Sequence, residues 1–214
     1  MPNFINKVIR TLIISDFFTN LGWGLLSPVF AIFILEKISH SGLTQAAGIA
    51  GLAALFYWIP KSFFQIPIGI YLDKYHGEKD DFWFMVIGTF LMALVPIGYL
   101  FSTLPWHIYL LQVVYAAGAA MALPSWMAIF TRHIDKGKEA FEWSTESTFL
   151  GTGAGIAGGL GGIMIAILGF NVLLICVSAF TMLSTLLLLV IRNDVFTRDG
   201  HTFIFPGEKP SVEP

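Results

Sequence analysis

The sequence contains little charge and almost no cysteine. Only 12% of its 214 residues are charged, about half the share of an ordinary soluble domain, whereas 56% are hydrophobic. The one cysteine, Cys176, lies in an apolar run, which excludes a disulfide scaffold. No basic patch is present, so we expect no binding to nucleic acid. Most of the chain is apolar, and this apolar sequence is arranged in long runs.

Six apolar runs are each long enough to cross a lipid bilayer, whose hydrocarbon core of about 30 Å requires roughly 20 helical residues. We interpret them as transmembrane helices at residues 8–35, 46–72, 82–101, 106–130, 141–168 and 170–191, with the tightest turn near Gly169. The first run is too long for a cleaved signal peptide and contains Asp16. The sequence therefore predicts a six-helix transmembrane domain over residues 1–192. A polar, proline-rich and disordered cytoplasmic tail is expected over residues 193–214.

Lysine and arginine are concentrated on one side of the predicted helices. The side that holds both ends of the chain carries ten of them, which are Lys7, Arg10, Lys74, Lys79, Arg132, Lys136, Lys138, Arg192, Arg198 and Lys209. The opposite side holds only Lys37, and Lys61 lies within a run. Because basic loops stay in the cytoplasm during insertion, both termini are predicted to be cytoplasmic, in a plasma or inner cell membrane. The same bias predicts that two associating copies lie parallel.

Three ionisable side chains, Asp16, Lys61 and Glu146, lie inside the predicted helices. Each costs about 2.5–3.5 kcal/mol at the centre of a helix, so such residues rarely face lipid. Polar and aromatic residues follow them at helical spacing and form stripes on three helices, which Ser27 and Trp126 extend. The residues that we assign to substrate or proton coupling are Asp16, Asn20, Trp23, Tyr57, Lys61, Gln65, Gln112, Tyr115 and Glu146. These stripes predict one cavity for a small solute.

Two interpretations of the buried charges remain open. In the first, Lys61 and a carboxylate form a structural ion pair within the bundle. In the second, Asp16 and Glu146 lie close together and share a proton, because two neighbouring carboxylates in a poorly hydrated site do not both ionise easily. The second interpretation is typical of a carrier coupled to protons.

The fifth predicted helix is rich in glycine. Its helix-packing candidates are Gly151, Gly153, Gly155, Gly158, Gly159, Gly161 and Gly162. Glycine costs about 1 kcal/mol relative to alanine in a helix, so this density indicates a close approach of helix backbones. The spacing Gly151-x-x-x-Gly155-x-x-x-Gly159 suits packing within one chain or against a second chain. Bends are also expected at the prolines within helices, which are Pro28, Pro60, Pro67 and Pro124.

The connection between the second and third helices carries a family signature. It reads Gly69-Ile70-Tyr71-Leu72-Asp73-Lys74-Tyr75-His76-Gly77-Glu78-Lys79. This segment resembles the signature Gly-x-x-x-Asp-(Arg/Lys)-x-Gly-(Arg/Lys)-(Arg/Lys) of major facilitator transporters, with one extra residue before Gly77 and with Glu78 at a basic position. The fifth helix similarly resembles the family motif Gly-x-x-x-Gly-Pro-x-x-Gly-Gly, in which Ala157 and Gly158 replace the second glycine and the proline. The residues assigned to gating are Gly69, Asp73, Lys74, Lys79 and Arg132.

The resemblance implies an all-α membrane bundle built as a 3+3 inverted repeat, although short internal sequence matches are no stronger than chance. Members typically have twelve helices, so six helices correspond to a half-size member that pairs as a parallel homodimer. The implied function is secondary transport of a small solute by alternating access, as a symporter or an antiporter. In twelve-helix members the signature aspartate faces the eleventh helix. In a homodimer, Asp73 of one copy would therefore face the start of the fifth helix of the other, near Ala140, with Arg132 as a second partner.

Two other functions remain as alternatives. A non-transporting six-helix subunit or assembly partner, derived from a transporter half, would keep the helices and lose the flux. An intramembrane enzyme is disfavoured, because neither His-Glu-x-x-His nor Gly-x-Ser-x-Gly occurs in the sequence. The sequence has no phosphate-binding loop Gly-x-x-x-x-Gly-Lys-(Ser/Thr), and its five histidines show no metal-ligand spacing. We expect no enzymatic activity, no cofactor and no metal.

Overall fold

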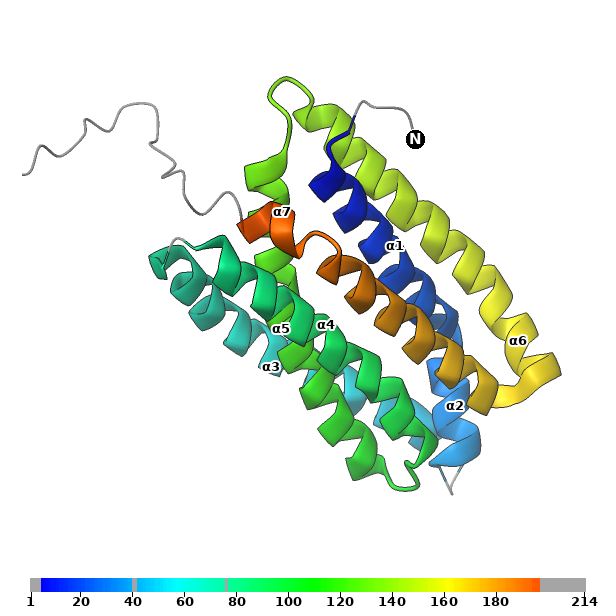
Figure 1. Cartoon of the computed structure of the whole chain (residues 1–214). Coiled ribbons are helices and arrows are strands. Elements are labelled where there is room, and N and C mark those ends of the chain that lie inside the picture. The colour runs from blue at the N-terminus through cyan, green and yellow to red at the C-terminus, as the bar shows by residue number, and fades with distance from the viewer. Residues whose placement is uncertain (1–4, 40–41, 76, 197–214) are drawn as a thin grey trace, which may run out of the picture.

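The computed structural model of the chain describes residues 5–39, 42–75 and 77–196. Its elements are α1 (Lys7–Leu26), the 3-10 turn η1 (Ser27–Val29), α2 (Phe30–Lys37), α3 (Leu43–Tyr75), α4 (Glu78–Leu100), α5 (Pro105–His133), α6 (Glu139–Leu189) and α7 (Arg192–Phe196) (Figure 1). The described residues form helices and no strand, which confirms the predicted all-α class.

Among the described residues, five helical segments are long and apolar enough to cross a membrane, and they are Lys7–Lys37, Leu43–Lys74, Glu78–Leu100, Pro105–His133 and Glu139–Leu189. In the first segment, Pro28 lies in η1, which interrupts the helix between α1 and α2. The last segment, α6, has 51 residues and reverses direction at Gly169, where φ is 76° and ψ is 171° (Figure 1). A positive φ of this size favours glycine. The reversal confirms the predicted turn and divides α6 into two limbs, 139–168 and 170–189.

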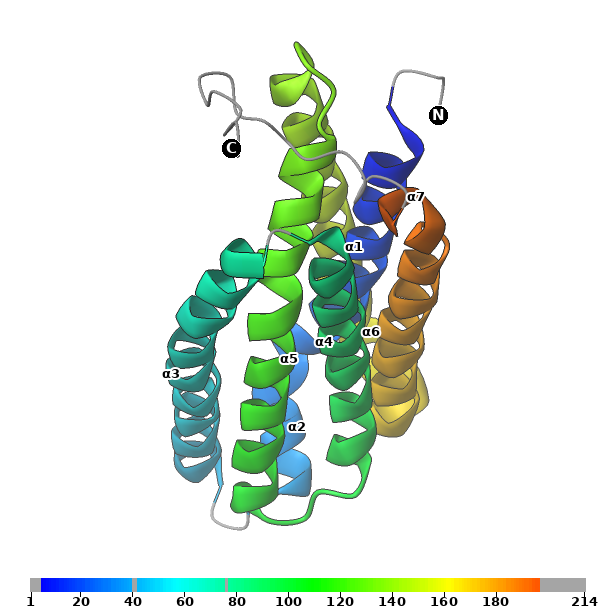
Figure 2. The same cartoon turned by 60° about the vertical axis from the view of Figure 1, so that its left-hand side comes forward.

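The chain connections lie at two opposite ends of the bundle (Figure 2). The start of α1, the end of α3, the 134–138 connection and α7 lie at one end, which we call the α7 end. The 101–104 connection and the reversal of α6, which the backbone angles place at Gly169, lie at the other, which we call the Gly169 end. At the α7 end, Lys7 Nζ lies 2.6 Å from Asp194 Oδ2, and Asn6 Nδ2 donates a 2.7 Å hydrogen bond to the His133 carbonyl. The first and last described helices therefore meet on the same side of the bundle.

The tail that was expected from residue 193 begins with helical structure instead. Residues 193–196 belong to α7, where Val195 is fully buried. The Phe196 ring packs against Phe82, with 5.4 Å between ring centroids. These two apolar side chains cover the start of α4, which explains why this turn is ordered. The remainder of the expected tail, 197–214, lies outside the described residues.

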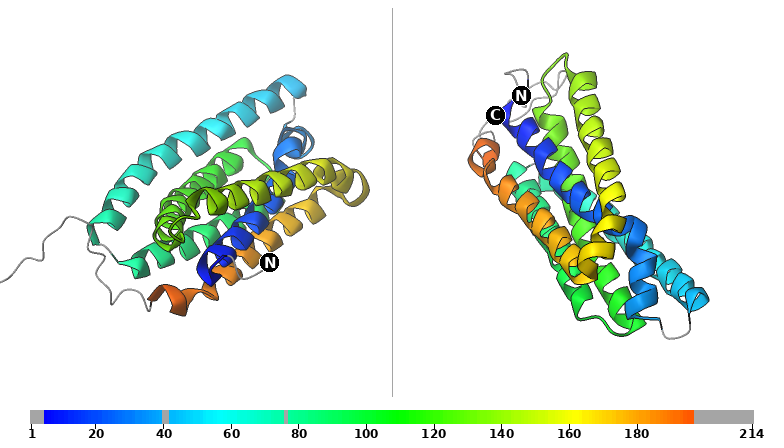
Figure 3. Two further views of the ribbon diagram at one scale, coloured as in Figure 1. Left: turned by 90° about the horizontal axis from the view of Figure 1, so that it is seen from above. Right: turned by 90° about the vertical axis from the view of Figure 1, so that its right-hand side faces the viewer.

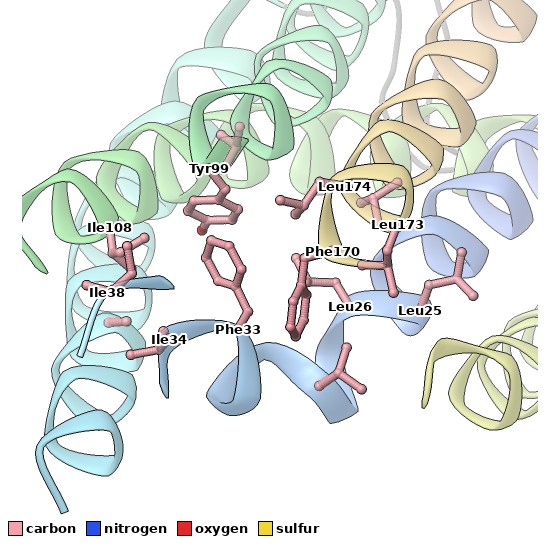
Figure 4. Close-up of a cluster of buried hydrophobic side chains, with 14 of the residues drawn as sticks. Leu25, Leu26, Phe33, Ile34, Ile38, Tyr99, Ile108, Phe170, Leu173 and Leu174 are labelled. Atoms are coloured by element: carbon pink, nitrogen blue, oxygen red, sulfur yellow. The ribbon is translucent and has the colours of Figure 1, made fainter. Parts of the chain in front are cut away.

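A hydrophobic cluster lies at each end of the bundle. At the Gly169 end, side chains of α1, α2, α4, α5 and α6 converge, and Phe33 packs against Tyr99 and Phe170 with centroid distances of 5.9 and 5.5 Å (Figure 4). At the α7 end, a second cluster includes the fully buried side chains of Ile9, Leu12 and Phe130. Within a bilayer, such clusters stabilise the bundle through van der Waals packing between helices, because lipid tails are as apolar as these side chains.

Small residues let α1 approach the first limb of α6. A methyl group added at Gly161 would collide with the Leu25 carbonyl oxygen, and one added at Gly153 would lie 3.0 Å from the Phe17 ring. Packing within the chain therefore uses the spacing Gly153-x-x-x-Ala157-x-x-x-Gly161. At the other five glycines that were assigned to packing, an added methyl group would meet no neighbouring helix or side chain of the described residues within 4 Å, and they are Gly151, Gly155, Gly158, Gly159 and Gly162.

Hydrogen bonds join α1 and α4 to the second limb of α6. The Ser15 and Ser184 hydroxyl oxygens lie 2.7 Å apart, and Thr19 donates to Ser184 Oγ at 2.8 Å. Ser178 donates to the Ala93 carbonyl of α4 at 2.7 Å. Because these groups are buried or half-buried, each bond also removes the cost of an unsatisfied polar atom. The second limb is thereby held in register with both neighbouring helices.

The first limb of α6 has one glycine face that packs against α1 and another that points away from the bundle. The same substitution is therefore expected to have different effects on the two faces. Gly161→Ala is expected to lower the free energy of unfolding by about 1–3 kcal/mol, because overpacking forces α1 and α6 apart. Gly162→Ala adds its methyl group in open space and should leave stability unchanged or raise it by up to about 1 kcal/mol. Denaturant titration in detergent micelles measures both variants. Equal stability of the two would contradict the assigned packing face.

Candidate solute site

A cavity of about 320 Å³ lies inside the bundle and is lined by side chains from α1, α3, α4, α5 and both limbs of α6. Seven of the nine residues assigned to coupling line it, and they are Asp16, Asn20, Trp23, Tyr57, Lys61, Tyr115 and Glu146. Asp16, Lys61 and Glu146, the three charged residues that the sequence placed inside the predicted transmembrane helices, are therefore brought to one place. Gln112 lines a second cavity, and Gln65 lies one turn of α3 beyond Lys61, outside the lining of both.

Three stacked aromatic rings separate the two cavities. The Tyr115 ring lies 4.0 Å from the Trp23 ring and 4.9 Å from the Tyr57 ring, measured between centroids, with both pairs stacked. These three residues line the first cavity and also the second, whose volume is about 310 Å³. Since Tyr99 and Gln112 line the second cavity, it lies towards the Gly169 end. The rings therefore form a partition between two polar spaces.

The two carboxylates face the first cavity. Glu146 is 8% exposed, and its charge lies within electrostatic range of Asp16. Asn20 Nδ2 donates a 2.9 Å hydrogen bond to the Asp16 backbone carbonyl, which leaves the Asp16 carboxylate free. Within the described part of the chain, neither carboxylate forms an ion pair. Both carboxylates are therefore available to a proton or to a cationic group of a solute.

Lys61 carries the positive charge of the cavity. Its Nζ atom lies 4.9 Å from the centroid of Trp58 and 5.6 Å from that of Tyr57. Cation–π contacts of this kind contribute about 0.5–2 kcal/mol. No carboxylate among residues 5–39, 42–75 and 77–196 lies within ion-pair distance of this ammonium group. The structural ion pair that was considered from the sequence is thus not formed among these residues.

Two indole groups add hydrogen-bond donors to the lining. Trp23 Nε1 and Trp126 Nε1 are buried and meet no acceptor in the described segments. Trp126, which extends the α5 stripe, stacks on Phe130 with 4.7 Å between centroids. A buried donor without a partner costs roughly 1–3 kcal/mol. A bound solute that offers an acceptor would recover this energy.

The α4 lining was missed from the sequence. Met85, Thr89 and Met92 line the cavity at positions i, i+4 and i+7 of α4. Two of the three are methionine, so this helix carries no polar stripe. Helical spacing places the three residues on one face of the helix. The isolated polar residue Thr89 was the one feature of the sequence that could have indicated that this face lines the cavity.

The residues assigned to gating lie near the α7 end. Arg132 of α5 forms an ion pair with Asp81 of α4, whose side chain is fully buried. Asp73 is exposed at the end of α3, within electrostatic range of Asp81. Asp81 was missed because residues 73–81 were interpreted as a connection, whereas α4 already begins at Glu78.

The other gating candidates are placed around this pair. Lys79 Nζ lies 5.8 Å from the Phe196 ring centroid, and Lys74 is exposed in the last turn of α3. A methyl group added at Gly69 would meet no neighbouring helix or side chain of the described residues within 4 Å. The exposed signature residues Asp73, Lys74 and Lys79 thus lie at the end of α3 and the start of α4.

Side chains of the 134–138 connection and of the first turn of α6 form hydrogen bonds and an ion pair at the start of this helix. Asp135 Oδ1 accepts a 3.3 Å hydrogen bond from Asn6, and Lys138 Nζ lies 3.2 Å from Asp135 Oδ2. The hydrogen bond from Asn6, together with Lys138, holds the pKa of the Asp135 carboxyl below its usual value. Glu139 and Glu142 accept hydrogen bonds from the backbone amides of Gly137 and Asp135. Two carboxylates therefore already occupy the first turn of α6, and they offset the helix-dipole attraction expected for Asp73 of a second copy.

A polar cavity that gathers ionisable side chains among membrane-length apolar helices is the arrangement expected of a membrane transport protein. The family model described as Major Facilitator Superfamily matches residues 12–212. The chain belongs to the major facilitator superfamily and is a multi-pass membrane protein of this transporter family. Comparisons with curated proteins and with solved structures found no significant match.

Proposed function

We propose that the chain is a secondary active transporter that moves a small solute by alternating access, as a parallel homodimer. The observation that carries this proposal is the convergence of Asp16, Lys61 and Glu146 from three helices on one cavity. Ionisable groups are expensive in a membrane and mark substrate or ion pathways when they face a shared interior space. The alternative, a non-transporting subunit, gives no reason to keep three such groups together.

The homodimer is supported by the two faces that the chain leaves uncovered. Helix α3 lies along the edge of the bundle (Figures 2 and 3) and exposes large apolar side chains, among them Phe63 at 73% and Ile66 at 68%. The first limb of α6 exposes Gly151, Gly155 and Gly159, the spacing at which two helix backbones approach closely in membranes. A second copy seated on these faces would complete the twelve helices typical of the family.

The orientation and the internal symmetry belong to the same proposal. We place the α7 end in the cytoplasm, in a plasma or inner cell membrane, because the basic residues cluster there. The helices would then divide into a 3+3 inverted repeat, and Asp73 of one copy would approach the start of α6 of the other near the exposed Ala140. Lys138 lies just before the acidic first turn of α6 and already pairs with Asp135, so the approaching carboxylate would share this cation with Asp135.

Proton coupling is the mechanism that the two carboxylates favour. Asp16 and Glu146 lie within electrostatic range in one cavity, and like charges this close disfavour simultaneous ionisation. One proton shared by the pair could be exchanged for, or carried with, a solute. The second cavity and the aromatic partition suit a carrier in which only one side of the solute site is open at a time.

The proposed function is tested by reconstitution. Purified protein in liposomes, with a pH-sensitive dye inside and an imposed pH gradient, is exposed in turn to amino acids, amines, organic anions and sugars. We expect at least one class to accelerate the collapse of the gradient above that of protein-free vesicles. No response to any class, from protein that is folded and correctly inserted, would favour the non-transporting subunit.

A further inference from the structure

The first cavity holds charges of both signs that are not neutralised within the described chain. The Asp16 and Glu146 carboxylates form no ion pair there, and the Lys61 ammonium lies against two aromatic rings instead of against a carboxylate. A solute that carried only a cation would satisfy the carboxylates and be repelled by Lys61. A solute that carried only an anion would satisfy Lys61 and be repelled by two carboxylates.

The neutral donors of the lining favour an acceptor on the solute. Trp23 Nε1 and Trp126 Nε1 are buried in the cavity wall without an acceptor among the residues described. A carboxylate offers several acceptor lone pairs to such donors. Lys61 and the two indole groups are therefore donors that line the same cavity and are available to an anionic group, while Asp16 and Glu146 accept a cationic group.

The apolar part of the lining fits a compact body between the two charged groups. The stacked rings of Trp23, Tyr115 and Tyr57 form one wall, and Leu123 and Leu150 add aliphatic surface. A volume of about 320 Å³ lies at the lower end of the range for small-molecule sites. The site therefore suits one small organic molecule and not an oligomer.

We propose that the solute of this cavity is a small zwitterion, with an ammonium group held by Asp16 and Glu146 and a carboxylate held by Lys61 and the indole donors. This inference rests on the proposed function only in treating the cavity as the solute site. It resolves the conflict between an aromatic lining, which suits cations, and Lys61, which suits anions, because both preferences apply to one molecule.

Binding to four probes with a common phenyl ring tests the proposal without any transport. The probes are phenylalanine, with both charges; phenethylamine, with the ammonium alone; 3-phenylpropanoate, with the carboxylate alone; and 3-phenylpropan-1-ol, with neither. Dissociation constants are measured by equilibrium binding to the full chain in lipid nanodiscs. We expect phenylalanine to bind at least tenfold more tightly than each of the other three.

Variants assign each charge to its partner. Lys61→Gln should reduce the affinity for phenylalanine to that for phenethylamine, and Glu146→Gln should reduce it to that for 3-phenylpropanoate. Asp16→Asn provides a second test of the acidic side should Glu146→Gln fail to fold. Lys37→Gln, an exposed change at the Gly169 end of α2, should keep the wild-type ranking.

Several outcomes would overturn the proposal. They are equal affinity for phenylalanine and for a singly charged probe, no binding of any probe, and a ranking that Lys61→Gln leaves unchanged. Because the measurement reads binding, zwitterion binding without flux would overturn the transport function alone. Flux of a solute with one charge or none would instead overturn the zwitterion and leave the transport function standing.

Discussion

Replacing Glu146 by glutamine is expected to abolish solute-dependent proton movement in the reconstituted protein. Glutamine keeps the size of the side chain and its ability to form hydrogen bonds, but it cannot release or accept a proton. Since Glu146 is 8% exposed and lies in the same cavity as Asp16, removing its charge leaves the pair without a shared proton. The rate of pH-gradient collapse should fall to that of protein-free vesicles. Asp16→Asn is expected to have the same effect.

The matched control for this result is Glu139→Gln. Glu139 lies on the same helix, at its first residue, and is exposed outside the cavity. This variant should show the wild-type rate. Size-exclusion profiles and thermal unfolding of all variants establish whether each is folded. Wild-type rates in folded Glu146→Gln and Asp16→Asn would refute proton coupling through this pair.

Gly155→Leu is expected to convert the proposed dimer to a monomer and to abolish transport together with it. Gly155 is exposed on the outward face of α6, where an added Cβ would meet no neighbouring group of the described residues within 4 Å, so we expect the leucine side chain to leave the fold of one copy intact. Against a second helix, the same side chain would separate the two backbones and remove the close contacts that drive association in membranes. Single-molecule photobleaching in liposomes counts the copies directly.

The control places the same side chain elsewhere on α6. Ala179→Leu adds a leucine at an exposed position of the second limb, which the proposed dimer does not use. It should remain dimeric and active. A dimeric Gly155→Leu protein, or a monomeric protein that transports at the wild-type rate, would contradict the assigned dimer face.

The sequence predicted the cavity better than it predicted the pairing of charges. Asp16, Asn20 and Trp23 share one face of α1 by helical spacing alone. Exposing the charge of Asp16 to lipid is energetically costly, so this face is expected to point into the bundle. Seven of the nine residues could be placed in the cavity because the period of a helix fixes which side chains point together. Gln65 has the same period yet lies outside the lining, because a stripe on a helix extends further than the cavity that it borders.

The packing face of α6 and the partner of Arg132 depend on which helices are neighbours. A single sequence does not show which helices are neighbours. Two glycine repeats are interleaved on the first limb of α6, and only the distances to Phe17 and Leu25 show that Gly153 and Gly161 face α1. The partner of Arg132 is a similar case. Asp81 is one of several acidic residues in a polar stretch, and it is selected because α4 begins early enough to bury it.

Crosslinking between two differently tagged copies tests the central claim, that two six-helix units form a parallel pair. One copy carries Asp73→Cys and the other carries Ala140→Cys, both in a Cys176→Ser background. Both positions are exposed, and neither copy can form a disulfide within itself. In native membranes, oxidation should yield a covalent dimer that carries both tags. No such dimer, from copies that are both inserted and folded, would contradict the parallel pair.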